Sequence, residues 1–286
     1  MKWEDRRRSS NVEDRRSQGS RMPGRGGLTV GGLVLILIVT LLRGGGIGDV
    51  LGSVIMSEVA SGGTQTEEYI ETPEHKKLAE FSKVVLADTE AVWTELFKQY
   101  GETYNPPTMV LYSGSVESGC GFASSQVGPF YCPMDKKLYI DLSFYDDLNK
   151  KYGASGDFAF AYVIAHEVGH HVQNELGIME QVQPLRQQLS EKEYNKYSVA
   201  LELQADYLAG VFAAYEQGQG YLEKGDIEEA LQAANAVGDD VLQKRAQGHV
   251  VPDSFTHGTG EQRMEWFMKG FKAGDLSEWD TFKYIK

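Results

Sequence analysis

The sequence predicts an α+β fold, in which a mainly helical body packs against a small β-sheet. Two short segments, residues 107–112 and 137–142, are expected to form strands, and the second alternates apolar with polar side chains. From Phe144 onward, apolar residues recur almost throughout at the spacing of a helix face. A length of 286 residues suits one large domain or two small ones.

Capping residues mark the predicted helix boundaries. The first long helix is expected to start at Thr72, a cap residue followed by proline and glutamate, and to end at residue 100. Ser190 and Asp226 each have a glutamate three residues later, which is the spacing of a capping box. Further helices are predicted over residues 157–176, 190–217 and 261–272 and from residue 226.

The amino-terminal head is basic, although the whole chain is acidic. Residues 1–27 carry eight basic and four acidic side chains, a net charge of +4, in a chain of net charge −13. The remainder therefore carries −17. Because an acidic body repels nucleic acid phosphates, we expect no nucleic-acid partner for the main domain.

An apolar segment follows the head. Residues 26–42 are 17 consecutive uncharged residues, the short end of what crosses a bilayer, and Arg25 and Arg43 bracket them. We therefore predict a transmembrane helix at residues 26–43, with a cleaved signal peptide or a buried core helix as the alternatives. The positive-inside rule then places a basic tail, residues 1–25, in the cytoplasm and the main domain outside it.

The segment after the predicted anchor is rich in glycine and serine. We expect residues 44–71 to be a flexible tether and residues 72–286 to form the folded domain.

The chain has two cysteines, Cys120 and Cys132, in a Gly-rich stretch. In the oxidising compartment that the predicted orientation implies, a disulfide between them is the simplest interpretation. It would close a short loop and contribute roughly 2–3 kcal/mol on the loop-entropy model. Two unpaired buried thiols are the alternative.

Residues 166–170 read His-Glu-Val-Gly-His within an apolar, helical stretch. Positions i and i+4 share a helix face, so His166 and His170 are predicted to bind one metal ion. Glu167 lies one step round the helix, where a base for a metal-bound water belongs. Two ordinary histidines hydrogen-bonded to neighbours are the alternative, but burying them together with a glutamate is costly unless they are paired or metal-bound.

The next long helix supplies a third candidate ligand. A catalytic zinc ion takes three protein ligands and keeps one open position. Glu202 and Asp206 share a face of an otherwise apolar helix. We predict that Glu202 binds the metal and that Asp206 accepts a hydrogen bond from a ligand histidine and orients it. A solvated acidic stripe is the alternative.

The pairing of His-Glu-Val-Gly-His with Glu-Leu-Gln-Ala-Asp at 202–206 resembles the gluzincin zinc peptidases. The whole chain is similar to the bacterial putative neutral zinc metallopeptidases. The similarity includes the Arg-rich head, the apolar segment, the stretches Cys-Gly-Phe-Ala and Gly-Pro-Phe-Tyr-Cys-Pro, and Thr-His-Gly-Thr-Gly-Glu-Gln-Arg at 256–263. The resemblance implies a zincin-like fold, a zinc cofactor, and an inner-membrane anchor in a Gram-negative bacterium with the domain in the periplasm.

The resemblance also bears on His257 and Arg263. The membrane-bound prenyl-protein endopeptidases likewise have Glu-x-x-x-Asp after the histidine motif, followed later by a His and an Arg. By that similarity, His257 and Arg263 are placed near the site, His257 as a second catalytic residue. Here Gly258 stands where that group is expected to have proline, so a loop histidine without a role is the alternative for His257.

Together these features predict a membrane-anchored zinc endopeptidase that hydrolyses protein or peptide substrates through a zinc-activated water. An edge strand within residues 128–140 is expected to pair with an extended substrate peptide. The alternative from another class is a zinc-bound, non-proteolytic binding module on the periplasmic side of the membrane. A weaker alternative is a hydrolase of another amide or of an ester, which the same residues would serve.

Overall fold

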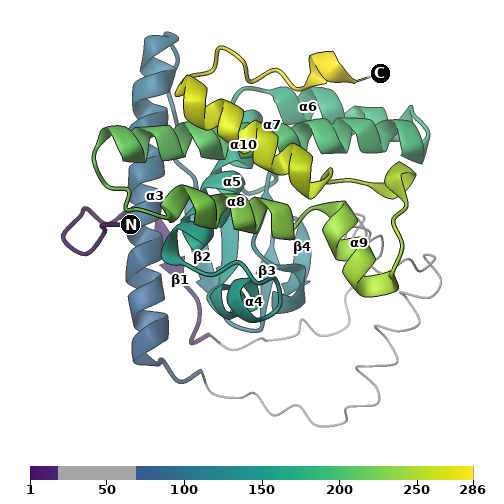
Figure 1. Ribbon diagram of the computed structural model, residues 1–286. Coiled ribbons are helices and arrows are strands. Elements are labelled where there is room, and N and C mark those ends of the chain that lie inside the picture. Colours follow the sequence, from purple (N-terminus) through teal and green to yellow (C-terminus); the bar gives the residue numbers. More distant parts are fainter. Residues whose placement is uncertain (19–68, 286) are drawn as a thin grey trace, which may run out of the picture.

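The computed structural model describes residues 1–18 and 69–285. They form an α+β fold in which helices surround a small sheet (Figure 1). The strands are β1 (Val12–Asp14), β2 (Thr108–Tyr112), β3 (Ser115–Ser118), β4 (Gly121–Ser124), β5 (Phe130–Cys132) and β6 (Lys137–Asp141). The helices are α3 (Pro73–Gln99), α4 (Phe144–Lys150), α5 (Asp157–Glu175), α6 (Ile178–Val182), α7 (Glu191–Gly218), α8 (Asp226–Ala236), α9 (Asp239–Gln247) and α10 (Gly260–Ala273). Short 3₁₀ turns are η1 (Ser125–Val127), η2 (Gln183–Gln187), η3 (Pro252–Ser254) and η4 (Phe282–Tyr284).

The main sheet has the strand order β1-β2-β6-β5. Strands β1, β2 and β6 run parallel, and β5 is antiparallel to β6. Met109 of β2 lies opposite Val12 on one side and Leu138 on the other. Strands β3 and β4 form a separate antiparallel hairpin. The two predicted strands agree with β2 and β6 to within one residue. Four of the five residues in each strand are buried, so the apolar side chains that predicted them lie in the core.

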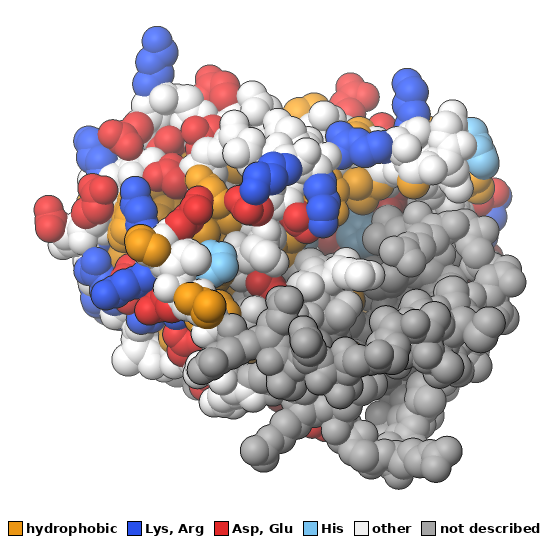
Figure 2. All heavy atoms as spheres, turned by 90° about the horizontal axis from the view of Figure 1, so that it is seen from below, with side chains coloured by type: hydrophobic (Ala, Val, Ile, Leu, Met, Phe, Trp, Pro, Cys, Tyr) orange, Lys and Arg blue, Asp and Glu red, His pale blue; other side chains and the backbone are white. Residues whose placement is uncertain are grey.

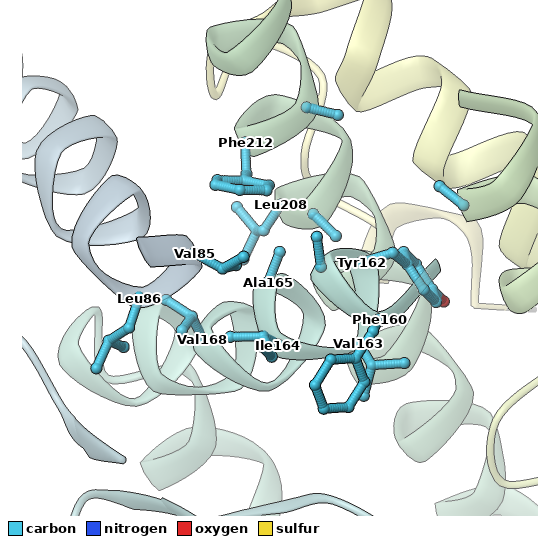
Figure 3. Packing of buried hydrophobic residues seen from close by; sticks show 14 of the residues in the cluster. Val85, Leu86, Phe160, Tyr162, Val163, Ile164, Ala165, Val168, Leu208 and Phe212 are labelled. Carbon is cyan, nitrogen blue, oxygen red and sulfur yellow. The ribbon is translucent and has the colours of Figure 1, made fainter. Parts of the chain in front are cut away.

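Helix α5 lies at the centre of the helical body. Fifteen of its nineteen residues are buried. Figure 3 shows side chains of α3 (Val85, Leu86) and α7 (Leu208, Phe212) converging on α5. An apolar helix enclosed on all sides is stable here because its neighbours remove it from water, and any polar side chain on it must find a partner.

Helices α7 and α10 cross at close range because each has a glycine at the contact. A Cβ atom at Gly210 would lie 2.0 Å from the carbonyl oxygen of Phe267. A Cβ atom at Gly270 would lie 1.9 Å from the carbonyl oxygen of Tyr207. Any larger residue at either glycine would force the helices apart, so this pair of glycines sets the distance between α10 and α7.

The predicted caps of α3 and α7 are present, but Asp226 does not cap α8. Thr72 and Ser190 accept hydrogen bonds from backbone N–H groups in the first turns of their helices. Asp226 is the first helical residue, and the cap position is Gly225. The Glu229 carboxylate instead accepts a 3.0 Å bond from the N–H of Phe158, so it serves the start of α5. The capping-box interpretation of this pair was wrong because a tertiary partner took the carboxylate.

The described part of the Arg-rich head, residues 1–18, is part of the fold. Strand β1 extends the main sheet beside β2. Arg6 reaches between α3 and α7, where its guanidinium lies 2.6 Å from Asp88, 3.0 Å from Glu216 and 3.4 Å from the centre of the Tyr221 ring. The basic composition of the head therefore reflects buried acidic partners in the domain as well as exposed charge.

The predicted single-pass membrane topology is wrong. Among the helices that the structure describes, none is both long and apolar enough to cross a membrane. Residues 1–18, part of the tail predicted to be cytoplasmic, pack on the domain that was predicted to be periplasmic, whereas a single crossing would put the two on opposite sides. The predicted anchor at residues 26–43 and most of the tether at 44–71 lie outside the described residues.

Charged side chains of both signs cover the surface. On the face seen in Figure 2, lysines and arginines are interspersed with aspartates and glutamates, and hydrophobic side chains lie between them. The acidic excess of the chain is therefore not gathered into one patch on the described part of this face.

Candidate metal centre

Helices α5 and α7 approach closely at the histidine motif. A Cβ atom at Gly169 would lie 3.0 Å from the carbonyl oxygen of Ala205 and 3.4 Å from its Cβ. The two small residues let the backbones pack directly on each other. Because Gly169 is next to His170, and Ala205 is next to Asp206, this contact brings the predicted site residues of both helices together.

The three predicted ligands converge. One ligand atom each from His166, His170 and Glu202 lies within 4.8 Å of the others. Nε2 of His166 is 3.2 Å from Oε2 of Glu202, and Nε2 of His170 is 3.5 Å from Oε1. With bonds of about 2.0–2.1 Å, two ligand atoms of a tetrahedral zinc ion lie about 3.4 Å apart. The donor atoms and their spacing therefore both fit zinc.

A buried charge network orients His166. Its Nδ1 lies 2.9 Å from Oδ1 of Asp206, which leaves Nε2 facing Glu202. Arg263 of α10 donates to both oxygens of Asp206, at 2.8 and 3.0 Å, and Tyr162 donates its hydroxyl to Oδ1. Burial opposes ionisation of Asp206, yet Arg263 and His166 keep its pKa below the usual value. Asp206 is therefore an ionised hydrogen-bond acceptor.

A neutral amide orients His170. Its Nδ1 lies 2.9 Å from Oε1 of Gln173, one helical turn later on α5. Its Nε2 therefore faces Glu202, as does Nε2 of His166. The two histidines present the same nitrogen to the centre, but one is supported by a carboxylate and the other by an amide.

Helix geometry puts Glu167, the residue after His166, on the side of α5 that faces β5. Its side chain points about 100° round the helix from His166. Asn174, seven residues later on the same face, donates to the hydroxyl of Tyr131 on β5 at 3.0 Å. Glu167 is only 8 % exposed.

His257 lies in the loop before α10, close to Glu202. Its Nδ1 is 2.9 Å from the hydroxyl of Thr256 and 3.2 Å from Oδ1 of Asp239, whose other oxygen accepts the backbone N–H groups of residues 256–258. Burial lowers the pKa of His257, but the carboxylates of Glu202 and Asp239 raise it more, so that the net shift is upward. The loop is thus anchored to α9, and Nε2 of His257 is the ring nitrogen that remains for the centre.

His171 holds β5 against α5. Its Nε2 lies 2.7 Å from the carbonyl oxygen of Asn105, which can only accept, so Nε2 is the donor. Nδ1 then accepts from the hydroxyl of Tyr131, 3.1 Å away. Burial lowers the pKa of His171. Beside Tyr131, Cys132 forms a disulfide with Cys120, with an S–S distance of 2.06 Å.

Several residues of the site were not identified from the sequence. Gln173, Tyr162 and Asp239 each contact a predicted site residue directly. The spacing of Gln173 from His170, one helical turn, was the available signal. No comparable sequence signal marked Asp239, because its partner His257 lies 18 residues away.

The chain matches a known protein family over nearly its whole length. The profile described as "Putative neutral zinc metallopeptidase" matches residues 1–282. The chain belongs to this family. The match includes the head as well as the metal centre, and zinc is the metal that the family name specifies.

Relatives of similar length are about half identical to this chain over the aligned residues. The Escherichia coli K12 protein "Uncharacterized protein YpfJ" is 50% identical over 292 residues, covering 99% of each chain. The Mycobacterium bovis protein "Uncharacterized protein Mb2605" and the Mycobacterium tuberculosis protein "Uncharacterized protein Rv2575" are each 45% identical over 204 residues, covering 68% of this chain and 67% of theirs. No solved structure matches this chain significantly.

Proposed function

We propose that this family member is a zinc-dependent endopeptidase. The observation that supports this most strongly is the convergence of His166, His170 and Glu202, with the buried Glu167 next to His166 in the chain. Three protein ligands leave one coordination position open, and a purely structural zinc site usually has four. A base next to the open position has a use in hydrolysis and none in a closed structural site.

Glu167 is the proposed general base. Zinc, when bound, lowers the pKa of a coordinated water toward neutrality and polarises a carbonyl group. Glu167 takes the proton from the attacking water and delivers it to the leaving amine. His257 donates a hydrogen bond from Nε2 to the carbonyl oxygen as negative charge develops there, and Asp239 holds its ring in place.

Strand β5 is the proposed substrate-binding edge. Among the described strands it pairs with β6 alone, so no described strand pairs with its other edge. Tyr131 ties β5 to the Glu167 side of α5. An extended peptide that adds to this edge would run past Glu167.

The test compares the full-length chain with its Glu167→Gln variant and a Glu175→Gln control on the same helix. Zinc content and release of new amino groups from a denatured protein are measured for each. We expect one zinc ion per chain in all three proteins, cleavage by the wild type and the control, and a loss of about 10²–10⁴-fold in Glu167→Gln.

The other outcomes separate the alternatives. Full activity of a zinc-loaded Glu167→Gln enzyme would overturn the assignment of the base. Zinc binding without cleavage by any of the three proteins would instead favour a zinc-bound binding module. Cleavage of small esters or amides but of no protein would favour a hydrolase of another substrate class.

A further inference from the structure

Gln173 is fully buried beside the proposed ligands and uses both ends of its amide. Its Oε1 lies 2.9 Å from Nδ1 of His170. Its Nε2 lies 2.7 Å from the carbonyl oxygen of Leu201 and 3.0 Å from Oε1 of Gln204, both on α7. Gln173 therefore connects a ligand on α5 with the residue that precedes Glu202 on α7.

The partners fix which way the amide points. The carbonyl oxygen of Leu201 can only accept a hydrogen bond, so the NH₂ group of Gln173 must face α7. Its oxygen must then face His170. An amide oxygen can only accept, so Nδ1 of His170 must carry the proton, and the lone pair of Nε2 is left for a metal.

A second amide continues the chain of hydrogen bonds. Nε2 of Gln204 donates to the carbonyl oxygen of Trp279, at 3.2 Å, so its Oε1 is the atom that faces Gln173. The series runs from the carbonyl oxygen of Trp279 through Gln204 and Gln173 to His170. Gln204 is 1% exposed, so water does not compete with these bonds.

We propose that Gln173, held by Gln204, is a positioning residue that fixes the tautomer and ring orientation of His170 for metal binding. Gln173 accepts a hydrogen bond from Nδ1 of His170, as Asp206 does from Nδ1 of His166, but the acceptor is a neutral amide instead of a carboxylate. This inference rests on the proposed function only in taking His170 as a ligand, and it is tested by metal affinity rather than by cleavage.

The experiment measures the zinc dissociation constant by competition with a chelator, in full-length protein, together with the free energy of unfolding in urea. Gln173→Met removes the acceptor and both donated bonds at similar volume. We expect it to weaken zinc binding about 10–100-fold. Gln204→Met leaves Oε1 of Gln173 in place and removes one of the two acceptors of its Nε2, so a smaller weakening is expected.

Gln173→Glu separates positioning from general destabilisation. Its carboxylate still accepts from Nδ1 of His170 but no longer donates two bonds to α7. We expect its stability to fall while its zinc affinity stays within about 3-fold of wild type, since a carboxylate serves equally well behind a ligand histidine. The control is Gln243→Met, which removes another buried amide that bonds to Ser254 and Val251, and it should bind zinc as wild type does.

Equal zinc affinity in Gln173→Met and wild type would overturn the inference. So would zinc affinities that follow the loss of stability across all four variants. A wild-type chain that binds no zinc would overturn this inference and the proposed function together. A wild type that binds zinc without cleaving protein would contradict the proposed function alone, and the affinities would still decide this one.

Discussion

Helix α7 carries acidic residues into two buried networks, and the two networks differ in what completes them. At its middle, Glu202 faces two imidazoles arranged around a position for an ion. Near its end, Glu216 faces Arg6 of the head, which also contacts Asp88. The first set of donors fits an ion, as proposed above, whereas the guanidinium of Arg6 completes the second network. A carboxylate in an apolar helix thus indicates a buried partner. The identity of that partner distinguishes a candidate metal centre from a buried ion pair.

The largest expected difference is in metal content. Glu202→Ala should reduce bound zinc from one ion per chain to almost none, because only two protein ligands remain. Glu216→Gln, the matched change in the other network, should keep its zinc. Metal analysis after dialysis checks both variants. Zinc retained by Glu202→Ala would show that Glu202 is not a required ligand and does not differ from Glu216 in this respect.

The second difference is in stability. Arg6→Met leaves the Glu216 carboxylate buried without its cation and should lower the free energy of unfolding by about 3–5 kcal/mol, with zinc content unchanged. Arg8→Met is the control, since its ion pair with Glu80 is partly exposed and contributes about 0–1 kcal/mol. Urea denaturation at one pH measures both. Equal losses of unfolding free energy in the two variants would show that the ion pairs of Arg6 contribute no more than an exposed pair.

The third test uses pH. Burial and the neighbouring Glu216 raise the pKa of Asp88 to about 8, against the opposing effect of Arg6. The folded chain therefore holds a proton at Asp88 that the unfolded chain loses near the ordinary aspartate pKa of 3.8. Between these two values the folded state binds more protons, so this group lowers stability progressively as pH rises from about 4 to about 8.

Asp88→Asn removes that titration. The free energy of unfolding of the variant should fall less steeply with pH over this window than that of the wild type. Urea midpoints at a series of pH values give the two slopes. Parallel slopes would mean that Asp88 ionises normally in the folded protein.

The smallest expected effect lies at the start of α10. Thr259 accepts a hydrogen bond from the backbone of Gln262 in a capping box. Thr259→Ala should cost about 1 kcal/mol of stability. Zinc affinity should not change, because Asp206 still holds Arg263. A large loss of zinc affinity would show that the helix start, and not only Arg263, is needed for the metal centre.

The sequence was most informative where the physics is local. The spacing of His166, Glu167 and His170 places them on adjacent helix positions without reference to the rest of the chain. The acids on α7 were identifiable for the same reason, as polar residues in an apolar helix. The contact between Gly169 and Ala205, by contrast, depends on how two helices cross, which local spacing does not specify.

The head shows where local reasoning failed. Its arginines were taken as a membrane-topology signal because their composition matches one. One of their actual partners, Glu216, lies 210 positions further along the chain than Arg6. Strand β1 was missed because Val-Glu-Asp has too few apolar residues to indicate a strand, and it pairs only because β2 presents an edge.

Docking of the head has a consequence for biosynthesis. Arg6 leaves the ribosome long before Glu216, from which it is separated by 210 residues. At typical rates of about 5–20 residues per second, the head waits roughly 10–40 s for this partner. Until then Arg6 has only Asp88 of this network to pair with, so the contact that joins the head to α7 forms only after α7 has been made.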